Sequence, residues 1–309
     1  MGYNQSSKKK PEGVYVPMVT PFNSSDESIN FQGLKEVTDF LTENGVDGII
    51  PSGSTGEMIA MNKDEQIKVN EAVCEYAAGR VKVFCSTGAY RTKDAVDLSK
   101  AAESAGADGV MVVTPWYMAP NDEELYEHYK AIRKAISIPV MLYHNPYYST
   151  CLLSDKFMAK LYNDNIIDAV KERQADVYRQ QDLRALTNES FGIFYGFDIC
   201  PVESLSCWAD GWVCGTGNLF PLENTTLYKL IKDNKLEEAK AYHFKKLRPY
   251  LPIFTENTDS GLPAPWLSIF KEGLKLRGID AGVARRPVMG VPDDVKVKLK
   301  KLLKEYGYI

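Results

Sequence analysis

Gly45-Val46-Asp47-Gly48-Ile49 follows a helix-like segment and precedes a short apolar run. The same pattern returns at Gly106-Ala107-Asp108-Gly109-Val110 and at Trp208-Ala209-Asp210-Gly211-Trp212. A glycine after a helix adopts the left-handed conformation of a C-cap, and the Asp-Gly pair then turns the chain into a strand. The spacings between the three copies suit whole numbers of βα units of roughly 30 residues. The repetition therefore predicts an array of alternating strands and helices.

Short β-rich runs are spread along the chain, and they are apolar throughout rather than alternating, as parallel strands buried on both faces require. They lie near residues 14–19, 48–51, 81–85, 110–113, 139–143, 166–171, 191–196 and 211–214. Helical patterns lie between them, at residues 31–43, 63–76, 93–104, 122–135, 154–162 and 175–186. This order predicts an α/β protein with a (β/α)8 barrel. A dinucleotide-binding sheet is disfavoured because Thr20-Pro21-Phe22, and no glycine-rich phosphate loop, follows the first strand.

The chain is expected to have three parts. Residues 1–12 are polar and contain a lysine run, so they read as a disordered arm, in which Gly2 and Ser6 match a myristoylation pattern. Residues 13–221 form the barrel, and residues 222–309 continue as helices packed on it. A chain of 309 residues can hold one such barrel as a single unit.

The composition excludes several classes of function. A formal net charge of -4 provides no basic field for nucleic acid, and no apolar run reaches the roughly 20 residues that a membrane span needs. The 6 cysteines contain no C-x-x-C pair and the 3 histidines are scattered, so we expect free thiols and no metal site. No secretory leader is recognisable, so we expect a cytoplasmic protein.

Reactive and polar residues cluster directly after the predicted strands. In a (β/α)8 barrel these positions meet at the C-terminal face, where active sites lie. The segments concerned are Pro51-Ser52-Gly53-Ser54-Thr55-Gly56-Glu57, Thr114-Pro115-Trp116-Tyr117, Tyr143-His144-Asn145-Pro146, Lys171-Glu172 and Gly196-Phe197-Asp198.

Two of these segments suggest chemistry. The turn Gly53-Ser54-Thr55-Gly56 can direct backbone N–H groups and two hydroxyls to one side, which suits a carboxylate. Lys171 ends an apolar strand, and barrel walls that desolvate it would lower its pKa and leave a nucleophilic amine. Tyr143, one strand earlier, would stand beside it as a proton-transfer group. The alternative for each residue alone is ordinary: a plain loop, and a lysine whose amine reaches solvent.

The sequence resembles the dihydrodipicolinate synthase and N-acetylneuraminate lyase superfamily of pyruvate-dependent class I aldolases. The resemblance runs from about Gly13 into the C-terminal helices and rests on five motifs in family order. They are Val16-Pro17-Met18-Val19-Thr20-Pro21-Phe22, Gly53-Ser54-Thr55-Gly56-Glu57, Leu142-Tyr143-His144-Asn145-Pro146, Val170-Lys171-Glu172 and Gly211-Trp212-Val213-Cys214-Gly215-Thr216-Gly217-Asn218.

The resemblance implies an enzyme, a carbon–carbon or carbon–oxygen lyase that forms an imine with pyruvate or another 2-oxo acid and needs no cofactor. Lys171 would be the Schiff-base lysine and Tyr143 the proton relay, helped by Thr55 and Tyr117. Ser54 and Thr55 would bind the substrate carboxylate, and the backbone of Val213 would line the pocket. Tyr117 would be lent across a subunit interface, which implies a homo-oligomer, a tetramer made of two tight dimers.

The chain departs from the family pattern at three positions. Tyr148 stands where the synthase that uses aspartate semialdehyde has an arginine, so we rank that activity below a lyase, aldolase or dehydratase role on another 2-oxo acid. Asp198 matches an acidic residue of the sialic acid branch, but Ile199 replaces the second one, which leaves a shorter sugar acid possible. Arg173 replaces a small hydroxyl residue and either points to the barrel mouth as an anchor for the second substrate or lies in the following loop, bonded to a neighbouring acid.

A non-catalytic protein that binds a 2-oxo acid remains the alternative from another class. The presence of both Lys171 and Tyr143 argues against it, because binding alone does not need the amine.

Overall fold

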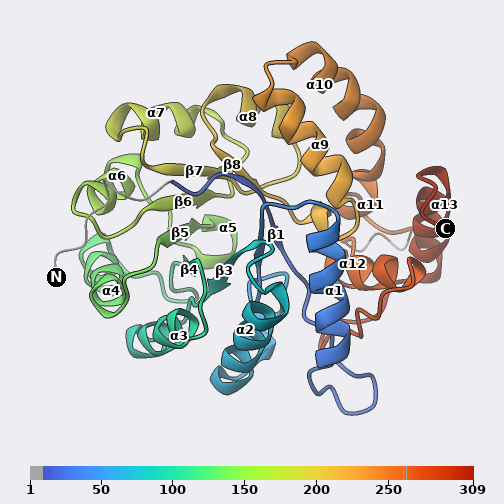
Figure 1. The fold of residues 1–309 in the computed structure, drawn as a ribbon, viewed down its shortest axis with the longest axis horizontal. Coiled ribbons are helices and arrows are strands. Elements are labelled where there is room, and N and C mark those ends of the chain that lie inside the picture. Colours follow the sequence, from blue (N-terminus) through green and yellow to red (C-terminus); the bar gives the residue numbers. More distant parts are fainter. Residues whose placement is uncertain (1–9, 260, 262) are drawn as a thin grey trace.

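The computed structural model describes residues 10–259, 261 and 263–309 and confirms the predicted barrel. Eight parallel strands pair in chain order, and the eighth closes on the first (Figure 1). They are β1 (Gly13–Pro17), β2 (Gly48–Ile50), β3 (Lys82–Ser86), β4 (Gly109–Val113), β5 (Val140–His144), β6 (Ala169–Glu172), β7 (Gly192–Tyr195) and β8 (Gly211–Val213).

The first helices match the sequence patterns closely, because side chains that the sequence supplies cap several of them. The side chains of Asn62 and Asn121 each accept a hydrogen bond from the backbone N–H of the third helical residue. That residue, Glu65 or Glu124, in turn accepts a hydrogen bond with its carboxylate from the backbone N–H of the asparagine. The helices before β8 are α1 (Phe31–Glu43), α2 (Lys63–Ala77), α3 (Thr92–Ser104), α4 (Asp122–Ala135), α5 (Pro146–Ser149), α6 (Asp155–Asn163), α7 (Tyr178–Leu186) and α8 (Pro201–Cys207), with the short turn η2 (Met58–Ala60).

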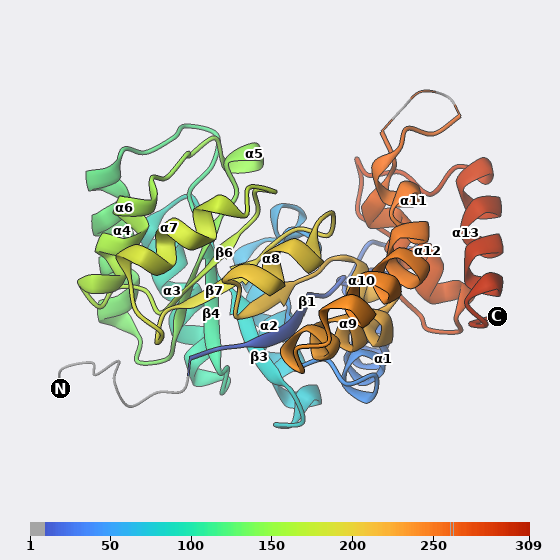
Figure 2. The ribbon, with the colours of Figure 1, turned by 90° about the horizontal axis from the view of Figure 1, so that it is seen from above.

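The chain after β8 is also helical, as predicted. Its elements are η3 (Thr216–Asn218), α9 (Pro221–Lys232), α10 (Leu236–Tyr242), η4 (His243–Leu247), η5 (Arg248–Tyr250), α11 (Pro252–Thr255), α12 (Trp266–Leu276) and α13 (Asp293–Glu305). Helix α9 packs on β1 and completes the ring of helices, and the Tyr228 hydroxyl donates to the carbonyl of Asp210 at 2.7 Å. Helices α11, α12 and α13 gather at one side of the barrel (Figure 2). We therefore propose that the barrel includes α9 and that the extension begins at α10 rather than at residue 222.

Side chains alternate along each strand between two apolar layers. One layer fills the barrel interior, where the ring of Tyr15 packs edge-on against Phe84 and Phe194 with centroids 5.3 and 5.1 Å away. The larger layer lies between the strands and the surrounding helices. This two-sided burial explains why the strands read as continuous apolar runs.

The repeated aspartates have one structural role at the N-terminal end of the barrel. Each precedes an even-numbered strand, and its Oδ2 accepts the backbone N–H near the start of the odd-numbered strand before it. The pairs are Asp47 with Val14 (2.8 Å), Asp108 with Val83 (2.9 Å), Asp168 with Val140 (2.8 Å) and Asp210 with Ile193 (2.9 Å). Asp168 belongs to the set although no glycine follows it, which is why the sequence pattern showed only three copies.

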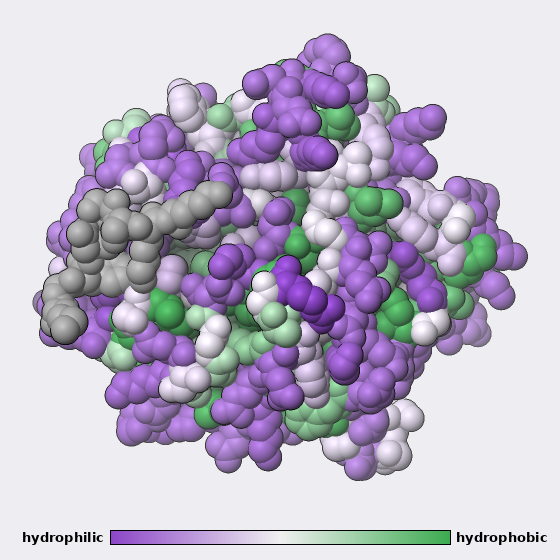
Figure 3. All heavy atoms as spheres, in the orientation of Figure 1, coloured by the Kyte–Doolittle hydropathy of each residue, from purple (hydrophilic) through white to green (hydrophobic). Residues whose placement is uncertain are grey.

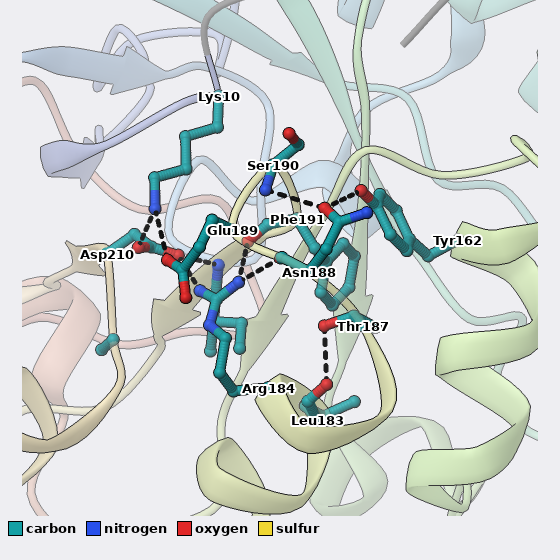
Figure 4. Close-up of polar contacts among 12 residues, drawn as sticks. Lys10, Tyr162, Leu183, Arg184, Thr187, Asn188, Glu189, Ser190, Phe191 and Asp210 are labelled. Carbon is teal, nitrogen blue, oxygen red and sulfur yellow. Dashed lines mark hydrogen bonds and ion pairs between the residues drawn. The ribbon is translucent and has the colours of Figure 1, made fainter. Parts of the chain in front are cut away.

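Asp210 forms ion pairs with two cations (Figure 4). Its carboxylate pairs with Arg184 at 2.6 Å and with Lys10 at 2.6 Å. Residues 1–9, with the myristoylation pattern at Gly2, lie outside the described residues. Lys10, which belongs to the arm expected at residues 1–12, is held by this carboxylate.

None of the helices within the described residues has the length and apolar character that crossing a membrane requires. The face in Figure 3 is mostly hydrophilic, with hydrophobic residues in small separate groups. All of the cysteines, Cys74, Cys85, Cys151, Cys200, Cys207 and Cys214, are free.

Asp210→Ala should destabilise the barrel by about 3–5 kcal/mol, because it leaves the Arg184 cation, whose side chain is 8% exposed, without its carboxylate. Asp47→Ala is the matched control, since Asp47 accepts the same kind of backbone bond without an ion pair to any described cation; its loss should be about 1–3 kcal/mol. Urea unfolding followed by circular dichroism measures both, and equal losses would contradict the role given to the ion pair.

Candidate active site

A cavity of about 180 Å³ lies at the C-terminal ends of the strands. Of the eight residues that the sequence nominated, seven line it: Ser54, Thr55, Tyr143, Lys171, Arg173, Asp198 and Val213. The eighth, Tyr117, follows β4 on the surface with 89% of its area exposed. The barrel therefore brings together residues that are far apart in the sequence.

Lys171 and Tyr143 are direct neighbours across the pairing of β5 with β6. The Lys171 Nζ lies 3.8 Å from the centre of the Tyr143 ring, and the lysine is 5% exposed. Burial, reinforced by the charge of Arg173, lowers the pKa of Lys171 to about 7. Space for the lysine stem depends on Gly196, where a Cβ would lie 2.9 Å from the Lys171 Cγ.

The Tyr143 phenol is held by side chains from two loops. The Asn145 amide donates to it at 2.9 Å, and Ser54 also hydrogen-bonds to it. Burial raises its pKa to about 12, so the phenol keeps its proton at neutral pH. The hydroxyl beside Tyr143 is thus that of Ser54.

The Ser54-Thr55 loop is fastened to the C-terminal extension by a buried ion pair. Lys271 of α12 lies 2.5 Å from the Glu57 carboxylate and donates to the carbonyl of Thr20 at 2.7 Å. Glu57 itself has a φ of 60°, a strained backbone conformation for a residue with a side chain. Sequence analysis did not identify Lys271, because nothing in its helical surroundings marks it as different from a surface lysine.

Asp198 lies in the pocket wall after β7. One carboxylate oxygen accepts from the backbone N–H groups of Gly215 and Thr216 at 3.1 and 3.3 Å. The other oxygen is buried and has no partner among the described residues. Burial raises the pKa of Asp198 to about 6.

Arg173 follows the last residue of β6, yet it continues the strand pairing, since its N–H donates to the carbonyl of His144 at 3.1 Å. Its guanidinium lines the pocket 4.3 Å from the centre of the Phe197 ring. Glu172, next to it, turns away to the outside of the barrel and pairs with His144 at 2.6 Å. Arg173 thus lies just beyond the end of β6, and its side chain lines the pocket.

The C-terminal extension supplies an apolar wall that sequence analysis missed. The residues concerned are Leu251, Phe254, Trp266 and Phe270. They come from η5, α11 and α12 or the chain beside them, and no local sequence motif indicates that they contact the ends of strands that precede them in the chain.

A second, larger cavity of about 580 Å³ opens beside Ser54. It is mostly apolar, and Met58, Trp116 and Tyr148 are among its lining residues. Tyr117, the neighbour of Trp116, has a φ of 76° and directs its side chain to solvent.

The lowered pKa of Lys171 leads to a direct prediction. Trace acetylation at increasing pH, read by mass spectrometry, should show Lys171 becoming reactive with a midpoint at about pH 7, whereas ordinary lysines titrate at about 10.4. Arg173→Gln should raise the midpoint because it removes a nearby positive charge. A Lys171 midpoint as high as that of ordinary lysines would contradict the desolvated site.

Comparisons with known proteins identify the family of this chain. The profile of the dihydrodipicolinate synthetase family matches residues 10–306. The 4-hydroxy-tetrahydrodipicolinate synthase of Geotalea uraniireducens is 33% identical over 298 residues, with 96% of this chain and 99% of the relative covered. The Bacillus subtilis enzyme of the same name is 33% identical over 294 residues, with coverages of 94% and 98%.

Among solved structures, the dihydrodipicolinate synthase of Aquifex aeolicus superimposes with a TM-score of 0.88 at 28% identity, covering 96% of this chain and 99% of that one. Enzymes of this group are lyases that hold pyruvate on a lysine as an imine, without an external cofactor. The chain belongs to the dihydrodipicolinate synthetase family and is a lyase of the class I aldolase type.

Proposed function

We propose that Lys171 forms the imine with pyruvate or a pyruvate-containing 2-oxo acid, and that Tyr143 relays the protons. The observation that carries this proposal is the buried amine, with a pKa of about 7, against the ring of a buried tyrosine. Near pH 7 about half of such an amine is neutral and can attack a ketone, whereas an ordinary surface lysine is almost entirely protonated.

The reaction begins when the amine adds to the ketone carbon and the ketone oxygen leaves as water. The protonated imine then withdraws electrons, so the neighbouring carbon loses either a proton or its aldehyde fragment and an enamine forms. In the reverse direction the enamine carbon attacks an aldehyde and water releases the product from Lys171. Tyr143 carries the proton in each step, and Ser54, which bonds to the phenol, shares the relay that the sequence assigned to Thr55.

The carboxylate of the 2-oxo acid is assigned to the turn at Ser54 and Thr55. Both residues line the cavity together with Val213. The turn offers hydroxyl donors beside the lysine, and the Glu57 to Lys271 ion pair keeps it in place.

Free thiols suit a reducing compartment, so we propose that the enzyme is cytoplasmic.

A second candidate is 4-hydroxy-tetrahydrodipicolinate synthase activity, which two relatives at 33% identity carry in their names. We rank it second because Tyr148 occupies the position of the arginine expected in that synthase. A non-catalytic binding protein is disfavoured because binding does not require a desolvated amine.

Tyr117 and the apolar cavity beside Ser54 suggest a homo-oligomer, which we propose is a dimer of dimers. Tyr117 is exposed and strained in its own subunit, while an apolar cavity lies open beside Ser54. Insertion of the partner subunit's Tyr117 into that cavity would bring a third hydroxyl to Tyr143 and Ser54.

Lys171→Ala should abolish the covalent adduct that pyruvate and borohydride leave on the protein, since no other amine replaces the nucleophile. Intact mass spectrometry measures the adduct, and circular dichroism checks that the fold is kept. Lys93→Ala, which removes a surface lysine, is the matched control and should trap pyruvate like the wild type. Trapping on the Lys171→Ala protein at the wild-type level would refute the proposal.

Tyr117→Phe should lower kcat by roughly 10²- to 10⁴-fold, the usual contribution of a proton-transfer group, without changing the oligomer. Sedimentation velocity gives the oligomeric state and steady-state kinetics give kcat. A fully active monomer would remove both the interface and the role of Tyr117.

A further inference from the structure

We propose that the active site selects substrates with a second anionic group, which Arg173 binds at the mouth of the pocket. The inference rests on the imine-forming function proposed above and adds the chemistry of the other half of the substrate. It assigns an anion, such as a carboxylate, to the end of the molecule that lies away from Lys171.

Arg173 is a pocket cation without a counter-charge. Its guanidinium makes no hydrogen bond or ion pair with any residue that the structure describes, although it is partly buried. The carboxylate next to it in sequence is already used: Glu172 accepts from His144, Arg179 and the backbone of Gln174. Partly buried cations are normally paired, so a free one in a binding pocket indicates a ligand that supplies the negative charge.

The nearby carboxylate of Asp198 does not neutralise Arg173 either. Its bonded oxygen accepts from Gly215 and Thr216, and no ion pair joins it to the guanidinium. The charge most closely associated with Asp198 is that of Lys171.

Aromatic rings hold the guanidinium in position while leaving its donors free. The central carbon lies 4.3 Å from the centre of the Phe197 ring, 5.5 Å from that of Tyr147 and 5.8 Å from that of Tyr148. Contacts with ring faces orient the planar group, and the N–H groups at its edge remain available for a bidentate anion. Tyr148 thus contributes to the anion site in a different way from the arginine that it replaces.

Strand geometry places this anchor on the same side as the reactive amine. Alternate side chains of a strand share a face, so Lys171 and Arg173 both face the cavity, with Arg173 nearer the mouth. The cavity of about 180 Å³ is smaller than the ~300–1,000 Å³ of typical ligand pockets. The favoured ligand is therefore a short 2-oxo acid with one anion at Ser54 and Thr55 and a second at Arg173.

Matched pairs of 2-oxo acids test this inference without requiring turnover. Each pair has equal chain length and differs only in the far carboxylate: 2-oxoglutarate against 2-oxopentanoate, and 2-oxoadipate against 2-oxohexanoate. Borohydride trapping on Lys171, read by intact mass, gives the concentration for half-maximal capture. In at least one pair the wild type should capture the diacid at a concentration roughly 10- to 100-fold lower, the effect of hydrogen bonds to a charged group.

Arg173→Gln should remove that preference while pyruvate capture persists. Because loss of Arg173 raises the pKa of Lys171, each protein's capture of the diacid and the monoacid is compared with its own capture of pyruvate at the same pH. Arg91→Gln, a change at an exposed surface arginine, is the control and should keep the preference. Equal capture within both pairs by the wild type, or a preference that survives Arg173→Gln, would overturn the inference. Failure of the wild type to trap pyruvate at all would instead refute the imine mechanism.

Discussion

The closed barrel depends on aspartate side chains that fix where neighbouring strands begin. Asp47, Asp108, Asp168 and Asp210 each bond the backbone of the strand before their own, so the same link occurs four times around the ring. A closed sheet has no free edge that could absorb a slipped register, and each strand start must therefore be set correctly. Three of the four aspartates also form ion pairs: Asp108 with Lys82, Asp168 with Arg133 and Asp210 with Arg184.

The strand register that is fixed at the N-terminal end of the barrel determines which side chains meet in the active site at the C-terminal end. Because β5 and β6 pair with Tyr143 opposite Lys171, the amine is placed against the phenol ring and away from water. One residue further along the same pairing, His144 meets Glu172 on the outer side of the barrel. The two strands thus carry a reactive pair on the inner face and a structural pair on the outer face, which helps to hold the reactive pair in register.

The helices after the barrel are part of the active site as well as of the scaffold. Lys271 binds Glu57 and thereby holds the loop that carries Ser54 and Thr55. Aromatic residues of the same region close one side of the cavity. A buried ion pair of this kind is costly to break because either charge alone would be left desolvated. The loop is therefore held in one conformation despite its left-handed residue at Glu57.

The sequence by itself determined the barrel, the order of its elements and the polar residues that follow its strands, because strand periodicity, caps and turn residues are local properties of the chain. It could not place Tyr148, Phe197 and Arg173 together. Nor could it predict that the Arg173 guanidinium has no hydrogen-bond partner among the described residues, whereas the Glu172 carboxylate has three. It also could not show that Asp168 repeats the role of Asp210, or that Lys271 reaches Glu57 across the molecule. Only the tertiary structure decided these points, because burial and pairing depend on side chains that meet when the barrel closes, and such contacts between distant segments leave no pattern in the neighbouring residues.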